Sequence, residues 1–311
     1  MKKIRIHSVW MLFLLSVFTC LQVKAQYMPV VFDKVYGDKN QIQLVCPLPG
    51  DEVAIVGKES QKYNLTWIER EGNVVFSLSL MGFTVVNEIV ELDNNRVLVV
   101  GQSTMQYVKG KKGKITLCGR VVVIERNGRI VNDIYAGDQG SNFLKGMLLR
   151  SGSFVVSGSE PKGADGRQGI LLKLDPTGSV VYQYKNAGGG YCDQFAVMGN
   201  SIEYICAAFS AGKDKEQALV VRLDDKGKPY YMTTIPAKQF VVTGLNANIN
   251  DGSVLVIGNS PADGGIIYKI RPEGDIVFAK NMIPANQGIA MLDHLQVARN
   301  GNILVGGSGS Q

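Results

Sequence analysis

The chain has 311 residues, 45% of them apolar, so it can bury a sizeable core and is neither disordered nor fibrous. Its 36 glycines follow no collagen-like period and occur beside many valines and isoleucines, which favours short strands joined by tight turns. The net charge of +6 comes largely from four basic residues before position 26; the remainder, 29 basic against 27 acidic residues, gives no support to a nucleic-acid partner.

The amino terminus has the features of a secretory signal peptide. Residues 2–5 are mostly basic, an apolar run covers residues 9–21, and small residues surround Ala25. The apolar run is shorter than the ~20 residues that a membrane-spanning helix needs. We therefore expect residues 1–25 to be cleaved and the protein to reach the periplasm or the cell surface, with no other membrane contact.

Two interleaved patterns repeat over residues 26–311. In the first, a glycine turn joins two apolar strands, and the turn glycine recurs at intervals of 56, 50, 49 and 47 residues. In the second, a turn precedes an apolar strand that ends in glycine or another small residue. The first pattern has its glycines at Gly72, Gly128, Gly178, Gly227 and Gly274, and the second covers residues 49–57, 94–101, 151–158, 199–208, 251–258 and 300–307.

Each period of roughly 50 residues holds four strands, which is typical of a β-propeller blade. The runs 120–125 and 169–174 are almost continuously apolar, which predicts sheets covered on both faces, as in blades that pack on one another. A β-solenoid and a pair of β-sandwiches are the alternatives, but neither favours tight turns at this spacing. We predict an all-β propeller of about six four-stranded blades, with units at residues 42–82, 84–137, 141–187, 191–236, 240–283 and 289–311.

The last unit raises two questions. Its segment 289–299 also fits an amphipathic helix, but its place in the repeat predicts a strand. The unit then stops after its second strand, and the segment 29–37 resembles the fourth-strand segment 275–282. We expect residues 29–37 to complete this blade, which removes an open sheet edge. A third strand would still be lacking, so either the blade has three strands or the chain is a truncated form of a longer protein.

The best-formed repeat is GILLKLDPTGSVVYQYKNAGG, residues 169–189. It resembles the short bacterial β-propeller repeat known as the SBBP repeat, in which an apolar strand, Lys-Leu-Asn/Asp, a turn glycine and a second strand follow one another. Other units depart from this pattern, with Glu69, Glu125 and Arg271 at the Asn/Asp position. The resemblance implies a propeller fold and leaves catalysis unaddressed.

The connections of such a blade lie at two ends. Tight turns join the first strand to the second and the third to the fourth at one end. The second-to-third and fourth-to-first connections lie at the other end and look longer and more variable, as binding loops often are. We predict binding residues there that combine aromatic area with polar groups: Tyr107, Lys111, Lys112, Asp138, Gln139, Tyr191 and Asp193.

Residues for catalytic and metal chemistry are few. His294 is the only histidine after cleavage, and a lone histidine in a strand is more often structural than catalytic. The four remaining cysteines include no CxxC pair, so we expect no metal and no cofactor. Cys192 and Cys206 could pair in an oxidising compartment, although cysteine is also an ordinary buried apolar residue.

The sequence thus predicts an exported, monomeric module that binds a protein or glycan partner at the cell envelope. The alternative is a carbohydrate-active enzyme, a glycoside hydrolase or lyase, because this chemistry needs only two acids brought close together. Its candidate acids come from different repeat units: Asp138, Asp193, Asp263 and Asp293. Acids gathered in one concave site would favour the enzyme, and scattered acids would favour the binding module.

Overall fold

The computed structural model describes ten stretches of the chain, all within the compact unit Gly37–Gln311. They are residues 41–93, 95–107, 114–163, 166–186, 190–198, 204–211, 217–248, 251–283, 290–298 and 301–309. Every regular element in these stretches is a β-strand, so none of the described residues forms a helix that could cross a membrane. The predicted signal peptide and the segment 29–37 lie outside the described residues.

The strands form antiparallel sheets in which each strand pairs with the next along the chain. Sheet 1 contains β1 (Gln41–Leu48), β2 (Glu52–Glu59), β3 (Lys62–Ile68) and β4 (Val74–Ser79). Sheet 2 contains β5 (Phe83–Asp93), β6 (Arg96–Tyr107), β7 (Lys114–Glu125) and β8 (Ile130–Ala136). Sheet 3 contains β9 (Asn142–Leu148), β10 (Phe154–Lys162), β11 (Gly166–Leu174) and β12 (Val180–Asn186).

The remaining strands repeat this order. Sheet 4 contains β13 (Cys192–Met198), β14 (Tyr204–Phe209), β15 (Gln217–Leu223) and β16 (Pro229–Lys238). Sheet 5 contains β17 (Val241–Ala247), β18 (Val254–Ser260), β19 (Gly264–Ile270) and β20 (Ile276–Ile283). Sheet 6 has two described strands, β21 (Ala290–Val297) and β22 (Ile303–Gly309). The predictions of an all-β chain with four-stranded antiparallel sheets, and of a strand within 289–299, are confirmed.

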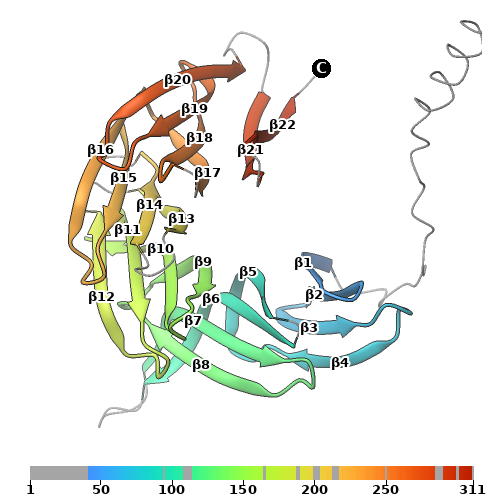
Figure 1. The fold of residues 1–311 in the computed structure, drawn as a ribbon. Helices are drawn as coiled ribbons and strands as arrows, with labels where there is room; N and C mark the ends of the chain where they lie inside the picture. Colours follow the sequence, from blue (N-terminus) through green and yellow to red (C-terminus); the bar gives the residue numbers. More distant parts are fainter. Residues whose placement is uncertain are drawn as a thin grey trace, which may run out of the picture. The chain divides into compact units, whose positions relative to one another are not determined.

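Neighbouring sheets pack face to face along the chain. The first strands contact one another in order, β1 with β5, then β9, β13, β17 and β21. In sheets 2 to 5 of Figure 1, these first strands lie on one side and the last strands, β8, β12, β16 and β20, on the other. Strand β6 shows the two covered faces: Val99 belongs to the core shared with sheet 1, whereas Leu98 belongs to the core shared with sheet 3.

The turn glycines of the first sequence pattern serve the contact between sheets as well as the turn. Gly227, between β15 and β16, has φ of +78°, and a Cβ built on it would lie 2.5 Å from the Tyr182 ring in sheet 3. Its counterparts approach the sheet before them in the same way, so a side chain at this turn would separate two sheets. The corresponding neighbours are Phe76 for Gly128, Ile134 for Gly178 and Tyr231 for Gly274.

The glycines of the second sequence pattern let paired strands approach closely. A Cβ on Gly101 would lie 2.1 Å from the Val85 carbonyl oxygen, and one on Gly258 would lie 2.2 Å from that of Val241. The residue after Gly258 is polar and bonds to the following sheet. Asn259, after Gly258, donates to the Leu292 carbonyl and accepts from the Leu292 amide, both at 2.9 Å. These bonds attach sheet 5 to sheet 6.

The cysteines of sheet 4 lie on its two opposite faces. Cys192 belongs to the core shared with sheet 3, and Cys206 belongs to the core shared with sheet 5. Both are buried thiols, and burial raises the pKa of Cys206 to about 11. The structure therefore agrees with two cysteines that are buried like apolar residues, and not with a disulfide bond between them.

Replacing Gly227 by alanine should destabilise the protein by about 1–3 kcal/mol. The new Cβ would collide with the Tyr182 ring, and alanine would also be strained at the positive φ of this turn. Gly50→Ala is a matched control, since Gly50 also has φ of +78° but nothing lies within 4 Å of its absent Cβ. Urea unfolding of the chain from Gln26 measures both. Equal losses in the two variants would show that the contact between sheets adds nothing.

Candidate functional site

The end predicted to carry long loops also contains tight hairpins. The sequence suggests a long second-to-third connection over the polar residues 102–114. This prediction is wrong at its flanks, because β6 continues to Tyr107 and β7 starts at Lys114, where the two residues are paired. The sequence suggests another such connection over residues 58–62, but the structure has a short turn there, between the paired residues Glu59 and Lys62. Polar composition suggested loops, but antiparallel backbone pairing does not depend on side-chain polarity.

The structure describes three of the seven predicted binding side chains. Asp138 and Gln139 are exposed in the connection between β8 and β9, and Tyr191 is 48% exposed just before β13. Tyr107 and Asp193 lie in strands β6 and β13, but their side chains, like all of Lys111 and Lys112, lie outside the described part. By strand order, the three described residues share the predicted end of their sheets.

Asp138 is held by a network that the sequence did not indicate. Lys185 in β12 lies 2.8 Å from the Asp138 carboxylate and 2.5 Å from the carboxylate of Glu160. Glu160 is only 1% exposed and also accepts a bond of 2.7 Å from Gln168. The buried carboxylate fixes the lysine, and the lysine fixes the exposed acid. No spacing signal reveals this, because Glu160 and Lys185 come from separate strands, β10 and β12.

Two of the four acids considered for glycoside hydrolysis interact with nearby protein side chains. Asp138 binds Lys185, and Asp263 accepts a bond of 3.1 Å from Ser260 in its own turn. Asp293 is exposed in β21, and the Asp193 side chain lies outside the described part. Among the described residues, no three His, Cys, Asp or Glu side chains are placed to share a metal ion. This arrangement gives the enzyme hypothesis no support.

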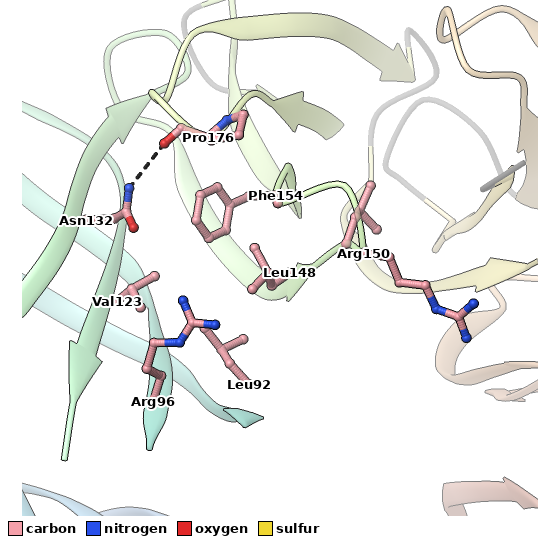
Figure 2. Close-up of a pocket in the computed structure, with 10 residues that line it drawn as sticks. Leu92, Arg96, Val123, Asn132, Leu148, Arg150, Phe154 and Pro176 are labelled. Atoms are coloured by element: carbon pink, nitrogen blue, oxygen red, sulfur yellow. Dashed lines mark hydrogen bonds between the residues drawn. The ribbon is translucent and has the colours of Figure 1, made fainter. Parts of the chain in front are cut away.

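A pocket of about 340 Å³ lies at the opposite, tight-turn end, between sheets 2 and 3. Figure 2 shows Val123 and Asn132 from sheet 2 facing Phe154, Leu148 and Pro176 from sheet 3. Asn132 Nδ2 donates to the Pro176 carbonyl at 3.1 Å, the bond drawn in the figure. The remaining lining residues are Leu92, Arg96, Leu149, Arg150 and Gly152.

The strand register explains why a pocket lies here. Val123 and Asn132 are a cross-strand pair between the third and fourth strands of their sheet. At the same register, each of the other four-stranded sheets carries an aromatic ring on its fourth strand. These pairs are Trp67–Phe76, Lys173–Tyr182, Arg222–Tyr231 and Lys269–Phe278. Sheet 2 is the four-stranded sheet with two smaller side chains at this place, and the space they leave is the pocket.

At two other junctions between sheets, larger side chains fill the register position that Val123 and Asn132 hold in sheet 2. Between sheets 1 and 2, buried Trp67 donates from Nε1 to Glu52 at 2.7 Å, and Arg126 of sheet 2 binds the same carboxylate at 2.6 Å. Between sheets 4 and 5, Arg222 lies over the Tyr204 ring and donates to the Pro272 carbonyl at 2.9 Å.

A sequence signal for the pocket was available. An aromatic residue follows the turn glycine by four positions in four of the five repeats, and Asn132 replaces it after Gly128. Ile134, two residues later, makes the contact to Gly178 that a ring makes elsewhere. The aligned repeats could therefore have indicated which junction is open, although not the size or lining of the opening.

No protein-family model and no curated protein matches this chain. Among solved structures, it is similar to a Bacteroides caccae protein of unknown function, with 15% identity over 81% of this chain and 85% of that one (TM-score 0.46). It is also similar to the Neurospora crassa Pan2 WD40 domain, with 14% identity over 84% and 69% of the two chains (TM-score 0.48). It is also similar to a Synechocystis apocarotenoid oxygenase, with 10% identity over 80% of this chain and 64% of the enzyme (TM-score 0.47). The match thus covers less than two thirds of that enzyme. Similarities this weak carry over neither activity nor ligand.

Replacing Glu52 by glutamine should lower the free energy of unfolding by about 1–3 kcal/mol at neutral pH, because Arg126 loses its charged partner. The Arg126 hydrogen bond holds the pKa of Glu52 below its ordinary value, although burial opposes this. Because its folded-state pKa is depressed, Glu52 stabilises the fold fully above the unfolded-state pKa of about 4.3, and this contribution is lost as pH falls from there through the lower folded-state pKa. The difference from wild type, measured by urea unfolding, should therefore shrink below that pH; Glu71→Gln, in an exposed turn, is the control.

Proposed function

We propose that the protein is an exported β-propeller of six blades that binds a protein or glycan partner at the cell envelope. The partner binds at the end that carries Asp138, Gln139 and Tyr191, together with Tyr107, Lys111, Lys112 and Asp193. Export rests on the basic start, short apolar run and small residues around Ala25 in the sequence.

The observation that carries this proposal is the ordered charge network at that end. Because Glu160 is buried and binds Lys185, the lysine and Asp138 are held in place before any partner arrives. Groups fixed in advance lose less conformational entropy on binding, which favours affinity. Exposed Tyr191 adds aromatic area, of the kind enriched in binding hot spots.

The exposed apolar surface of sheet 6 supports the proposed closure of the sixth blade. Leu304 is 59% exposed and Ile303 is 37% exposed on β22, and Met291 on β21 is 50% exposed. A strand made by residues 29–37, with its Val-Val-Phe run, would cover such side chains and pair a sheet edge. This closure completes the architecture that the resemblance to SBBP repeats implies.

Deleting residues 29–37 from the mature chain should lower the free energy of unfolding by several kcal/mol, because the apolar side chains of sheet 6 lose their cover. A chain lacking only residues 26–28 is the matched control and should be unaffected. Urea unfolding, followed by hydrogen exchange of β21 and β22, measures both. Equal stability and equal exchange in the two chains would contradict closure by residues 29–37.

Partner binding should depend on the proposed end and not on the opposite one. The mature chain from Gln26 serves as bait in a pull-down from envelope extracts and as probe on a glycan array. Asp138→Lys combined with Tyr191→Ser should weaken binding at least about tenfold, because charge and aromatic area are both lost. Glu273→Lys, in an exposed tight turn of sheet 5, should leave it unchanged. If the two variants lose binding equally, or neither does, the proposed face is wrong.

A further inference from the structure

The pocket between sheets 2 and 3 lies at the opposite end of the sheets from the proposed partner face at Asp138. We propose that this pocket binds a small uncharged phenol, a molecule with the aromatic ring and the hydroxyl of a tyrosine side chain. The site is separate from the proposed function, because none of the residues named above as its lining belongs to the Asp138 end.

The repeat shows which chemical group is missing from this junction. Asn132 holds the register position of Tyr182 in sheet 3 and of Tyr231 in sheet 4. Both tyrosines are 8% exposed, and their rings pack on the turn glycine of the following sheet. In sheet 2, Ile134 makes that glycine contact, and the shorter Asn132 side chain leaves the space beside it open. A phenol in the pocket would supply the ring that the fourth strand of sheet 2 lacks.

The walls of the pocket suit an aromatic ring. Six of the ten lining residues have apolar side chains, and Figure 2 shows Phe154 and Leu148 of sheet 3 across the opening from Val123 of sheet 2. Phe154 is 2% exposed and Val123 is 1% exposed, so the packing around them holds their side chains in place. A ligand ring can stack on Phe154 in an offset or edge-on arrangement. The volume of about 340 Å³ lies at the lower end of the range for small-molecule sites, roughly 300–1,000 Å³.

The Asn132 amide determines the polar part of the ligand. Its nitrogen donates to the Pro176 carbonyl at 3.1 Å, which directs the side-chain oxygen away from Pro176, as Figure 2 shows. This oxygen accepts no hydrogen bond from the residues that the structure describes. An amide oxygen can only accept, so the matching ligand atom is a donor such as a hydroxyl. A phenol hydroxyl has a pKa of about 10 and therefore carries no charge at neutral pH.

The two arginines of the lining do not call for an anion. Arg96 and Arg150 each have an interaction partner within the protein. Their aliphatic stems can line the opening while the charged ends stay with these partners. An uncharged ligand is consistent with this arrangement, because it leaves the charge balance of the junction unchanged.

Three probes with the same tolyl body test the proposal on the chain from Gln26. They are p-cresol, which carries the phenol hydroxyl, toluene, which lacks it, and p-toluate, which carries a carboxylate instead. Saturation-transfer NMR and isothermal titration should show saturable binding of p-cresol and weaker binding of p-toluate. The carboxylate binds more weakly because a charge would leave water without a free cation to meet it.

The variant Asn132→Leu removes the acceptor and keeps a side chain of similar size. It should weaken p-cresol binding about 2- to 12-fold, the range for one hydrogen bond, and leave toluene binding no weaker than in the wild type. Arg70→Gln is the matched surface control, at an exposed arginine whose Nε lies 3.5 Å from Asp51 in sheet 1, and should change neither affinity.

The variant Asn132→Tyr places the protein's own ring in the pocket and should abolish binding of p-cresol and of toluene. Urea unfolding establishes that each variant is folded. If Asn132→Tyr does not fold, Val123→Met fills part of the same space and should weaken both probes.

Four outcomes would overturn the proposal. They are tighter binding of p-toluate than of p-cresol, equal weakening of p-cresol and toluene in Asn132→Leu, full p-cresol affinity in folded Asn132→Tyr, and no saturable p-cresol binding by the folded wild-type chain. Partner binding at the Asp138 end should persist in these pocket variants, so failure of one proposal can be told from failure of the other.

Discussion

The structure depends on sheets that have two apolar faces and hide them against one another. Strand β6 contributes alternate residues to two different cores, and the same holds for the middle strands of sheets 3 to 5. A single sheet of this kind could not be stable in water, because burying both faces requires a neighbour on each side. The repeat is therefore a physical necessity for this composition.

Glycine makes this packing possible at two kinds of position in the repeat. The turn glycines let a hairpin approach an outer strand of the preceding sheet, as Gly227 approaches Tyr182. The glycines of the second strands let the first strand come close, as Gly101 does with Val85. In both places, neighbouring atoms occupy the space that a Cβ would need. This explains why glycine is so abundant in a chain that otherwise favours strands.

Regular packing also defines where the molecule can differ from one unit to the next. One register position lies at each junction, and it is filled by Trp67 in sheet 1 and by Arg222 with Tyr231 in sheet 4. With Val123 and Asn132, sheet 2 leaves a pocket there. On a repeated scaffold, binding sites usually lie where one unit differs from the others. This chain differs at both ends of its sheets, with the pair Val123 and Asn132 at the tight-turn end and the Glu160–Lys185–Asp138 network at the other.

The sequence by itself determined the strands, the tight turns and the four-stranded repeat, because glycine spacing and apolar runs express local backbone preferences. It also marked Asp138, Gln139 and Tyr191 as exposed, but it placed loops where β6 and β7 continue to pair. Only the tertiary structure decided that Glu160 is buried beneath Lys185, and how large the space beside Val123 is and which residues line it. Both features arise between strands distant in the chain or between two sheets, and such contacts depend on packing that no single repeat encodes.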